Sequence, residues 1–316
     1  MVQQENYEVI IVGGGPAGLA AGLYCKRAAL NTVLIEKGLL GGQIAISKDV
    51  ENYPGVEGIT GFDLAEKLIH HVQTFGLKII QQEVAAVNAG SDLHFVRLVN
   101  GDLLQTTALI LALGGTARKL GIVGEAEYLG SGVSYCGTCD GFFFRNKTVV
   151  VVGGGDTAVE EALYISRLAK KVFLVHRKNT LRANKLLQSR LMAEPSIEII
   201  WNTIITEIKG NGKVVESVSL KNIETGEVGD LPTDGVFIFI GYSPNNQLIP
   251  PGVGINELGF VLTDDRCETS VSGIFAVGDV RQKFANQIVV AAADGCIGAL
   301  AAAHYVELRR SVVRSF

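Results

Sequence analysis

Two stretches of the chain follow the same pattern: Tyr7–Lys37 reads YEVIIVGGGPAGLAAGLYCKRAALNTVLIEK, and Lys147–Arg177 reads KTVVVVGGGDTAVEEALYISRLAKKVFLVHR. They align without a gap, each residue of the first lying opposite the residue 140 positions later. In each copy an apolar, β-branched run precedes a glycine turn and helical periodicity follows it: Val9–Val12 and Leu19–Ala28, then Val149–Val152 and Val159–Leu168. Continuous apolar runs are typical of buried parallel strands. The repeat therefore predicts two βαβ units.

The glycine turn has the spacing of a dinucleotide-binding site. Gly13 makes the tight turn, Gly15 lets the backbone approach a pyrophosphate, and Gly18 lets helix and strand pack closely. The second copy repeats these places with Gly153, Gly155 and, in the last, Ala158. A glycine turn alone can be merely structural, but a strand before it and a helix after it, twice, favour nucleotide binding.

The two copies differ in charge where the second strand ends. Glu36 can accept hydrogen bonds from a free ribose hydroxyl and would repel a 2′-phosphate, so the first site suits FAD or NAD. The equivalent position holds His176, followed by Arg177 and Lys178, with Arg182 nearby. These cationic donors suit the 2′-phosphate of NADPH, although a solvated basic cluster is the simpler alternative.

A third segment completes the first site. Gly273–Asp279 is an apolar strand that ends in glycine and a carboxylate, and an alanine-rich, helix-like run from about 287 to 305 follows it. Asp279 would face the crevice at the carboxyl end of the sheet, where open α/β sheets bind ligands. A cap of a turn or helix is the alternative role for Asp279.

The second unit then interrupts the first. We expect an α/β protein with two Rossmann-like three-layer nucleotide-binding domains. Residues 1–116 and 246–316 would form a discontinuous FAD-binding domain, and 117–245 an inserted NAD(P)H-binding domain that carries the CxxC pair. Turn residues mark the two linkers, Gly114–Thr116 and Tyr242–Asn245.

Composition narrows the function classes. The chain of 316 residues has 28 basic and 32 acidic side chains and a net charge of −4, without a dense basic stripe, so we expect no nucleic-acid partner. The longest apolar runs, such as Leu109–Leu113, are strand-length, so we expect no membrane partner. Met1–Tyr7 lacks the features of a secretory signal, which predicts a cytoplasmic protein.

A dithiol motif, Cys136-Gly137-Thr138-Cys139-Asp140, precedes the second unit. In a reducing compartment a CxxC pair is catalytic, redox-sensing or metal-binding more often than structural. A zinc site would need a second CxxC or a spaced histidine pair, and the adjacent His70 and His71 do not supply one, so we expect no metal. The other three cysteines are interpreted as small buried hydrophobes: Cys25, Cys267 and Cys296.

Over essentially its whole length the chain resembles the low-molecular-weight thioredoxin reductases, which are FAD-dependent pyridine nucleotide-disulfide oxidoreductases. The resemblance rests on the order and spacing of Gly13–Gly18 (GGGPAG), Glu36–Gln43 (EKGLLGGQ), Glu51–Gly55 (ENYPG), Cys136–Gly141 (CGTCDG), Gly153–Ala158 (GGGDTA), His176–Ala183 (HRKNTLRA) and Gly278–Val280 (GDV) with Gln287.

The resemblance implies a homodimer in which NADPH reduces FAD, FAD reduces the CxxC disulfide, and the dithiol reduces thioredoxin or a thioredoxin-like disulfide protein. It implies that Cys139 faces the flavin and that Cys136 attacks thioredoxin. Asp140 would be the acid that supplies a proton, with an Asp-Gly turn residue as the alternative. It also implies that the inserted domain rotates about its two linkers, since the dithiol must serve both the flavin and thioredoxin.

The same resemblance assigns the cofactor contacts. Those to FAD are Gly13, Gly15, Pro16, Ala17, Gly18, Glu36, Lys37, Gly42, Gln43, Asn52, Val84, Gly114, Asp279, Gln287 and Ile288. Those to NADPH are Gly153, Gly155, Asp156, Thr157, Ala158, His176, Arg177, Lys178 and Arg182.

Four residues depart from the family pattern. Lys178 stands where arginine is common, which weakens the preference for NADPH over NADH because lysine lacks the bidentate fork. The other departures are Leu113, Gly137 and Asn286. Two alternatives stay open: a related flavin disulfide reductase that uses NADH, ferredoxin, a deazaflavin or another disulfide partner, and a non-enzymatic nucleotide-binding regulator.

Overall fold

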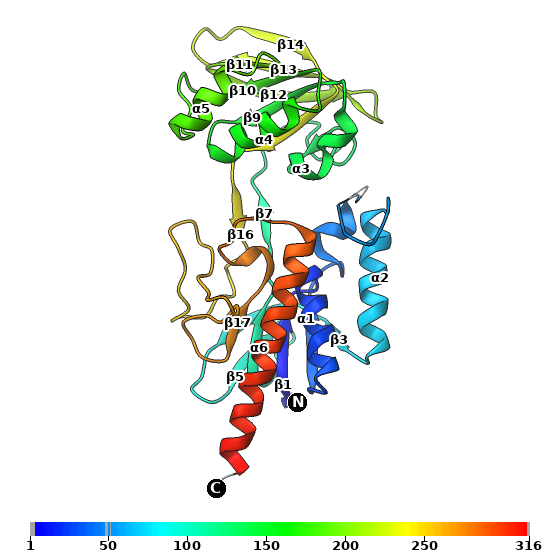
Figure 1. Ribbon diagram of the computed structural model, residues 1–316, viewed down its shortest axis with the longest axis vertical. Helices are drawn as coiled ribbons and strands as arrows, with labels where there is room; N and C mark the ends of the chain where they lie inside the picture. The colour runs from blue at the N-terminus through cyan, green and yellow to red at the C-terminus, as the bar shows by residue number, and fades with distance from the viewer. Residues whose placement is uncertain (1–3, 48–49, 51, 315–316) are drawn as a thin grey trace. The chain divides into compact units, whose positions relative to one another are not determined.

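The computed structural model describes residues 4–47, 50 and 52–314 (Figure 1). The chain divides into two compact units, Met1–Thr116 with Ser243–Phe316, and Ala117–Tyr242. The second boundary falls at 242/243 rather than at the expected 245/246. Asn245 explains the difference, because its backbone N–H donates to the Gly114 carbonyl and its side-chain amide donates to Leu113.

Unit 1 contains a seven-stranded sheet in the order β3-β2-β1-β6-β5-β4, with β17 paired to β6. Strands β1, β2, β3, β6 and β17 pair in parallel, whereas β4 and β5 are joined antiparallel at the edge. The strands are β1 (Gln4–Val12), β2 (Thr32–Glu36), β3 (Lys78–Gln81), β4 (Val84–Asn88), β5 (His94–Leu98), β6 (Leu103–Leu111) and β17 (Ile274–Ala276).

Both faces of this sheet are buried, which explains the continuous apolar runs. Val9 and Ile11 belong to one hydrophobic cluster with the helices, and Ile10 and Val12 belong to a second cluster on the opposite face. The helical elements are α1 (Pro16–Arg27), η1 (Gly42–Ile46), α2 (Gly61–Thr74), η3 (Gly278–Val280) and α6 (Ile288–Arg314).

Helix α6 is long and apolar enough to cross a membrane by length and composition. Its packing explains that composition differently. A Cβ added at Gly295 would lie 2.1 Å from the Ala17 carbonyl oxygen of α1, and Ala299 and Ala302 are buried in the unit 1 core. These contacts make α6 a core helix of unit 1.

Unit 2 has three layers. Its central parallel sheet has the order β11-β10-β9-β15-β8, with helices on one face and a three-stranded antiparallel sheet, β12-β13-β14, on the other (Figure 1). The strands are β8 (Val133–Ser134), β9 (Thr148–Gly153), β10 (Lys171–Val175), β11 (Ile197–Ile200), β12 (Thr203–Gly210), β13 (Val215–Asn222), β14 (Val228–Pro232) and β15 (Gly235–Phe239). The helical elements are α3 (Gly137–Asp140), η2 (Gly141–Phe144), α4 (Asp156–Ser166) and α5 (Lys185–Met192).

The predicted α/β class and the two βαβ units are confirmed. Helices α1 and α4 begin at Pro16 and Asp156, which are equivalent positions of the repeat. Both begin earlier than the predicted Leu19 and Val159, because each starts directly at its glycine turn. The linkers, expected as turns, are short strands that pair with each other, β7 (Gly115–Ala117) and β16 (Tyr242–Pro244).

Candidate active site

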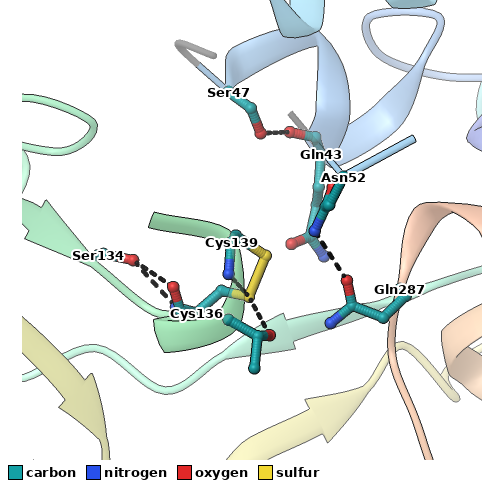
Figure 2. The surroundings of a disulfide bond; sticks show 8 residues. Gln43, Ser47, Asn52, Ser134, Cys136, Cys139 and Gln287 are labelled. Atoms are coloured by element: carbon teal, nitrogen blue, oxygen red, sulfur yellow. Dashed lines mark hydrogen bonds between the residues drawn. A yellow bond between two sulfur atoms is a disulfide. The ribbon is translucent and has the colours of Figure 1, made fainter. Parts of the chain in front are cut away.

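The CxxC pair forms a disulfide, Cys136–Cys139, with a Cα–Cα distance of 5.3 Å. Strand β8 leads into it, and the Ser134 hydroxyl fixes its start by accepting from the Cys136 N–H at 3.0 Å and donating to the Cys136 carbonyl at 3.1 Å (Figure 2). Cys136 is the N-cap of α3, and its Sγ accepts the Cys139 N–H at 3.2 Å. The disulfide therefore sits in a hydrogen-bonded turn at the start of a helix.

The surroundings of the disulfide are accessible. Cys139 is exposed, and Cys136 and Asp140 are half-buried. Directly after α3, Phe142 and Phe143 expose 50% and 37% of their surface. Sequence reasoning missed this aromatic pair, although the run Gly141–Phe144 next to the dithiol is visible in the sequence.

In the first glycine turn, two of the three glycines have no room for a side chain, and the third faces open space. A Cβ added at Gly13, whose φ is +111°, would lie 2.2 Å from the Ala112 carbonyl oxygen, and one at Gly18 would lie 1.9 Å from the Gly13 carbonyl oxygen. In contrast, a Cβ at Gly15, the N-cap of α1, would meet nothing within 4 Å. This open space before a helix N-terminus fits a pyrophosphate.

Glu36 supports this turn. Its Oε2 accepts the Gly14 N–H at 2.6 Å, and its Oε1 accepts the Gly38 N–H at 2.7 Å. A carboxylate has about four lone-pair sites, so acceptor capacity remains for a ribose hydroxyl. Glu36 is thus fixed in position at the carboxyl end of β2, as an acceptor of ribose hydroxyls requires.

Other residues expected at the first site lie in unit 1 around its loops and helix starts. Asn52 donates to Gln287 at 3.2 Å, and Ser47 donates to the Gln43 carbonyl at 3.1 Å (Figure 2). The side-chain amide of Gln43 also donates to the Gly115 carbonyl. Further positions are Pro16 at the start of α1, Lys37 paired with Glu83, Gly42 beside Gly15, Val84 at the start of β4, Gly114 with φ +67°, and Ile288 at the start of α6. Glu51 of the motif lies outside the described residues.

Asp279 belongs to a buried charge cluster that the sequence did not predict. The Lys283 ammonium lies 2.9 Å from Asp279 and 3.5 Å from Asp294, and Arg281 contacts Asp294 at 3.0 Å. Lys283 and Asp294 are almost completely buried. Because a buried cation holds it, Asp279 is a fixed acceptor at the end of β17.

The second glycine turn has the same arrangement of space. A Cβ added at Gly153 would collide with Ala158 and Phe239, whereas one at Gly155 would approach only the Arg182 guanidinium, at 3.9 Å. The exposed Arg182 therefore places a positive charge at the mouth of the turn. Asp156 accepts the Asn184 N–H at 2.7 Å and ties the loop before α5 to the start of α4, where Thr157 is also exposed.

His176 departs from the expected cationic role. It is only 6% exposed, and its Nε2 lies 3.0 Å from the Thr180 carbonyl. Burial lowers its pKa, so the ring is neutral at pH 7. A Cβ added at Gly154 would lie 2.2 Å from the imidazole ring, so the His176 side chain packs directly against the backbone of the glycine turn. Arg177 and Lys178, by contrast, are exposed.

Comparisons with known proteins show which family the chain resembles. Residues 7–295 match the family model of the pyridine nucleotide-disulphide oxidoreductases. The chain is 44% identical over 308 residues to the thioredoxin reductase of Bacillus subtilis (strain 168), covering 97% of each chain. It is 45% identical over 305 residues to that of Treponema pallidum (strain Nichols), covering 96% of this chain and 98% of the relative. The crystal structure of thioredoxin reductase from Streptococcus pyogenes MGAS5005 matches with a TM-score of 0.92 and 41% identity, covering 96% and 99%.

Two glycine substitutions should separate cofactor binding from folding. Gly15→Ala is expected to lose flavin while the flavin-free protein keeps its stability to within about 1 kcal/mol, because the new methyl occupies only open space. Gly18→Ala should lose about 1–3 kcal/mol of stability with or without flavin, because its methyl meets backbone. Flavin absorbance per protein after gel filtration, and thermal unfolding of flavin-free protein, measure the two effects. Full flavin retention by Gly15→Ala would contradict the assigned pyrophosphate position.

Proposed function

The chain belongs to the pyridine nucleotide-disulphide oxidoreductases and, within them, to the thioredoxin reductases, and from that membership we propose that it carries electrons from NADPH through FAD to the Cys136–Cys139 disulfide and on to a thioredoxin. The observation that carries the proposal is the disulfide itself, held at the start of α3 in the unit that also bears the second glycine turn.

FAD is the cofactor that unit 1 fits best. The open position at Gly15 can receive the pyrophosphate, and the fixed carboxylate of Glu36 can accept ribose hydroxyls. Asp279, held by Lys283, would bind a polar group of the same cofactor at the carboxyl end of β17. When bound, the flavin supplies the capacity to accept a hydride and to pass an electron pair to a disulfide.

NADPH is the nucleotide that unit 2 fits best. Arg177, Lys178 and Arg182 are exposed near the carboxyl end of β10 and the glycine turn, where a 2′-phosphate would lie. The neutral His176 would contribute shape beneath Gly154 rather than charge. Two arginines remain to give the bidentate contacts that Lys178 cannot give.

The two cysteines would divide the chemistry. An electron pair breaks the S–S bond and leaves two sulfur anions, at least one of which takes a proton; Asp140, next to Cys139, is the proposed donor. The Cys136 thiolate then attacks a disulfide sulfur of thioredoxin, forming a mixed disulfide and releasing a thiolate. Attack by Cys139 on Cys136 releases reduced thioredoxin and restores the starting disulfide.

Thioredoxin would dock on the aromatic pair beside the dithiol. Phe142 and Phe143 are half-exposed, and exposed aromatic side chains are the usual anchors of protein interfaces. Their position in η2, directly after α3, would bring a bound disulfide protein to Cys136.

We further propose a cytoplasmic homodimer. Helix α6 exposes an apolar stripe whose spacing puts its members on one face of the helix: Val289, Ile297, Leu300 and Leu308. A second copy of the chain would cover it. Cys25 and Cys267 are buried, unpaired thiols, which suits a reducing compartment.

Catalysis would also need the inserted unit to move, because the dithiol must serve both a flavin and a protein. The paired linker strands β7 and β16 are the two chain connections that would absorb this rotation.

Anaerobic titration tests the donor. NADPH should bleach the flavin absorbance of the purified protein, and oxidised thioredoxin should restore it. Arg177→Ala should weaken NADPH about 10- to 100-fold, through loss of a charge-assisted hydrogen bond, while leaving NADH unchanged. Arg190→Ala, on α5 of the same unit, is the control. A flavin that neither NADPH nor NADH bleaches would instead indicate another donor, such as ferredoxin or a deazaflavin.

The Cys139→Ser variant tests the order of the electron path. It should retain reduction of the flavin by NADPH, because the nucleotide site is unchanged, and lose thioredoxin reduction completely, because no disulfide remains to accept electrons. Stopped-flow flavin absorbance and a thioredoxin-coupled assay measure the two steps. If NADPH no longer reduces the flavin in this variant, the disulfide does not follow the flavin in the order of electron transfer, and the proposed path is wrong.

Truncation of the aromatic pair tests the docking surface. Phe142→Ala and Phe143→Ala should each lower kcat/KM for thioredoxin about 5- to 30-fold, the effect of removing an interface anchor worth about 1–2 kcal/mol. Reduction of a small disulfide such as DTNB should be unaffected. Met192→Ala, which removes a side chain that is 61% exposed on α5, is the matched control. If Phe142→Ala, Phe143→Ala and Met192→Ala change kcat/KM for thioredoxin equally, the thioredoxin-docking surface is not at the aromatic pair.

A further inference from the structure

A carboxylate that the proposed function does not use lies beneath the redox helix. Glu161 projects from α4, which packs against α3. A Cβ added at Gly137 would lie 2.2 Å from the Glu161 Oε2 and 3.0 Å from the Ile165 Cδ1. The Glu161 carboxylate thus fills the space that any side chain at position 137 would need.

This carboxylate is poorly solvated. Its Oε2 is inaccessible to solvent and has no hydrogen-bond partner among the described residues. Burial raises the pKa of Glu161, and this effect outweighs the Thr138 and Gly137 backbone N–H groups, which lower it, so that the pKa is about 7. Glu161 therefore changes charge near neutral pH.

The turn that contacts Glu161 also holds the dithiol. Cys136 caps the turn that Gly137 and Thr138 begin, and its Sγ accepts the Cys139 N–H at 3.2 Å. When the disulfide opens, a thiolate at Cys136 is stabilised by the Cys139 N–H of this turn. An anionic Glu161, held by the Gly137 and Thr138 N–H groups on the other side of the turn, repels that thiolate. A neutral Glu161 does not repel it.

We propose that Glu161 is a positioning residue for the redox pair: from beneath α3, its charge sets how readily Cys136 ionises after the disulfide is reduced. Gly137 is part of this arrangement, because only glycine leaves the carboxylate its place. The proposal deepens the function proposed above and rests on the dithiol being its redox centre.

Other charges around Glu161 come from each element packed on α4. Glu160, on the same helix, raises the pKa of Glu161 further. Asp140 is the carboxylate of α3. Strand β11 carries Glu198, which pairs with Lys171 of β10 at 3.0 Å, and α5 carries Lys185 and Arg190.

The reduction step shows why this charge matters. Two electrons added to the S–S bond give two sulfur anions, and one proton leaves a thiol and a thiolate. If Glu161 is neutral, the remaining negative charge can rest on Cys136 in contact with the turn. If Glu161 is ionised, two anions lie at one turn, their repulsion disfavours the thiolate, and Cys136 holds its proton more tightly.

Alkylation of Cys136 by iodoacetamide as a function of pH tests the proposal, and it requires neither nucleotide nor thioredoxin. The background is the full-length Cys139→Ser/Cys296→Ser protein, in which Cys136 is the accessible thiol because Cys25 and Cys267 are buried. Glu161→Gln should move the midpoint of the rate profile to lower pH and make it a single step. The alkylation rate is compared at a pH above about 7 and below the midpoints of both proteins. There, each pH unit by which the midpoint falls should raise the rate about threefold, because tenfold more thiolate is offset by about threefold lower nucleophilicity.

Gly137→Ala provides a second, independent variant. Its methyl group should displace the Glu161 carboxylate without removing it, and should move the profile in the same direction as Glu161→Gln. Glu224→Gln, an exposed carboxylate in the turn between β13 and β14, is the control and should leave the profile unchanged.

Shifts to lower pH in both Glu161→Gln and Gly137→Ala support the proposal. An unshifted profile in Glu161→Gln, or one shifted to higher pH, overturns it. A shift in Glu161→Gln without one in Gly137→Ala overturns the role given to Gly137. If NADPH does not bleach the flavin but the alkylation profile still shifts, only the proposal that NADPH is the electron donor is contradicted. The proposal for Glu161 and the proposed function can therefore fail independently.

Discussion

Close approach of backbone to backbone is the constraint on which both glycine turns depend: a Cβ at Gly13 would meet the Ala112 carbonyl oxygen, and one at Gly153 would meet the Phe239 carbonyl oxygen. In unit 1 the Cα of Gly18 sits against the Gly13 carbonyl so tightly that a single methyl group would not fit. This contact sets the start of α1 over the end of β1 and leaves open space at Gly15. The buried parallel strands and the packing of α6 on α1 hold the turn in place, so the fold supplies an open helix N-terminus, which a phosphate would suit, without any charged side chain.

Duplication of this turn would let one scaffold hold two different cofactors, because the specificity would lie in the side chains that surround each turn. In unit 1 the carboxylate of Glu36 accepts two backbone N–H groups and would favour a free ribose. In unit 2 Arg182 lies beside Gly155, and Arg177 is exposed after β10. The dithiol belongs to unit 2, on a short helix that packs against the helix of its own glycine turn. The second glycine turn and the disulfide are therefore built on neighbouring helices of one unit.

The sequence predicts the backbone of this protein well, because apolar β-branched runs and glycine spacing report directly on buried strands and tight turns. The α/β class and the positions of both βαβ units followed from them. Side-chain direction was harder to predict. His176 occupies the position equivalent to Glu36, yet its ring turns inward beneath Gly154, since a flat ring fits under a residue without a Cβ. Glu161, on α4, and Lys283, in the loop before α6, were missed for a related reason: the sequence pattern does not reveal which polar side chain a neighbouring element buries.

The central claim is that flavin and disulfide act in series in one subunit, and the number of electrons the protein accepts tests it most directly. Anaerobic reductive titration with dithionite should consume about four electrons per subunit, two for each centre, whereas the Cys139→Ser variant should consume about two. Uptake of only two electrons by the unmodified protein would contradict the account, because the disulfide would then lie outside the electron path.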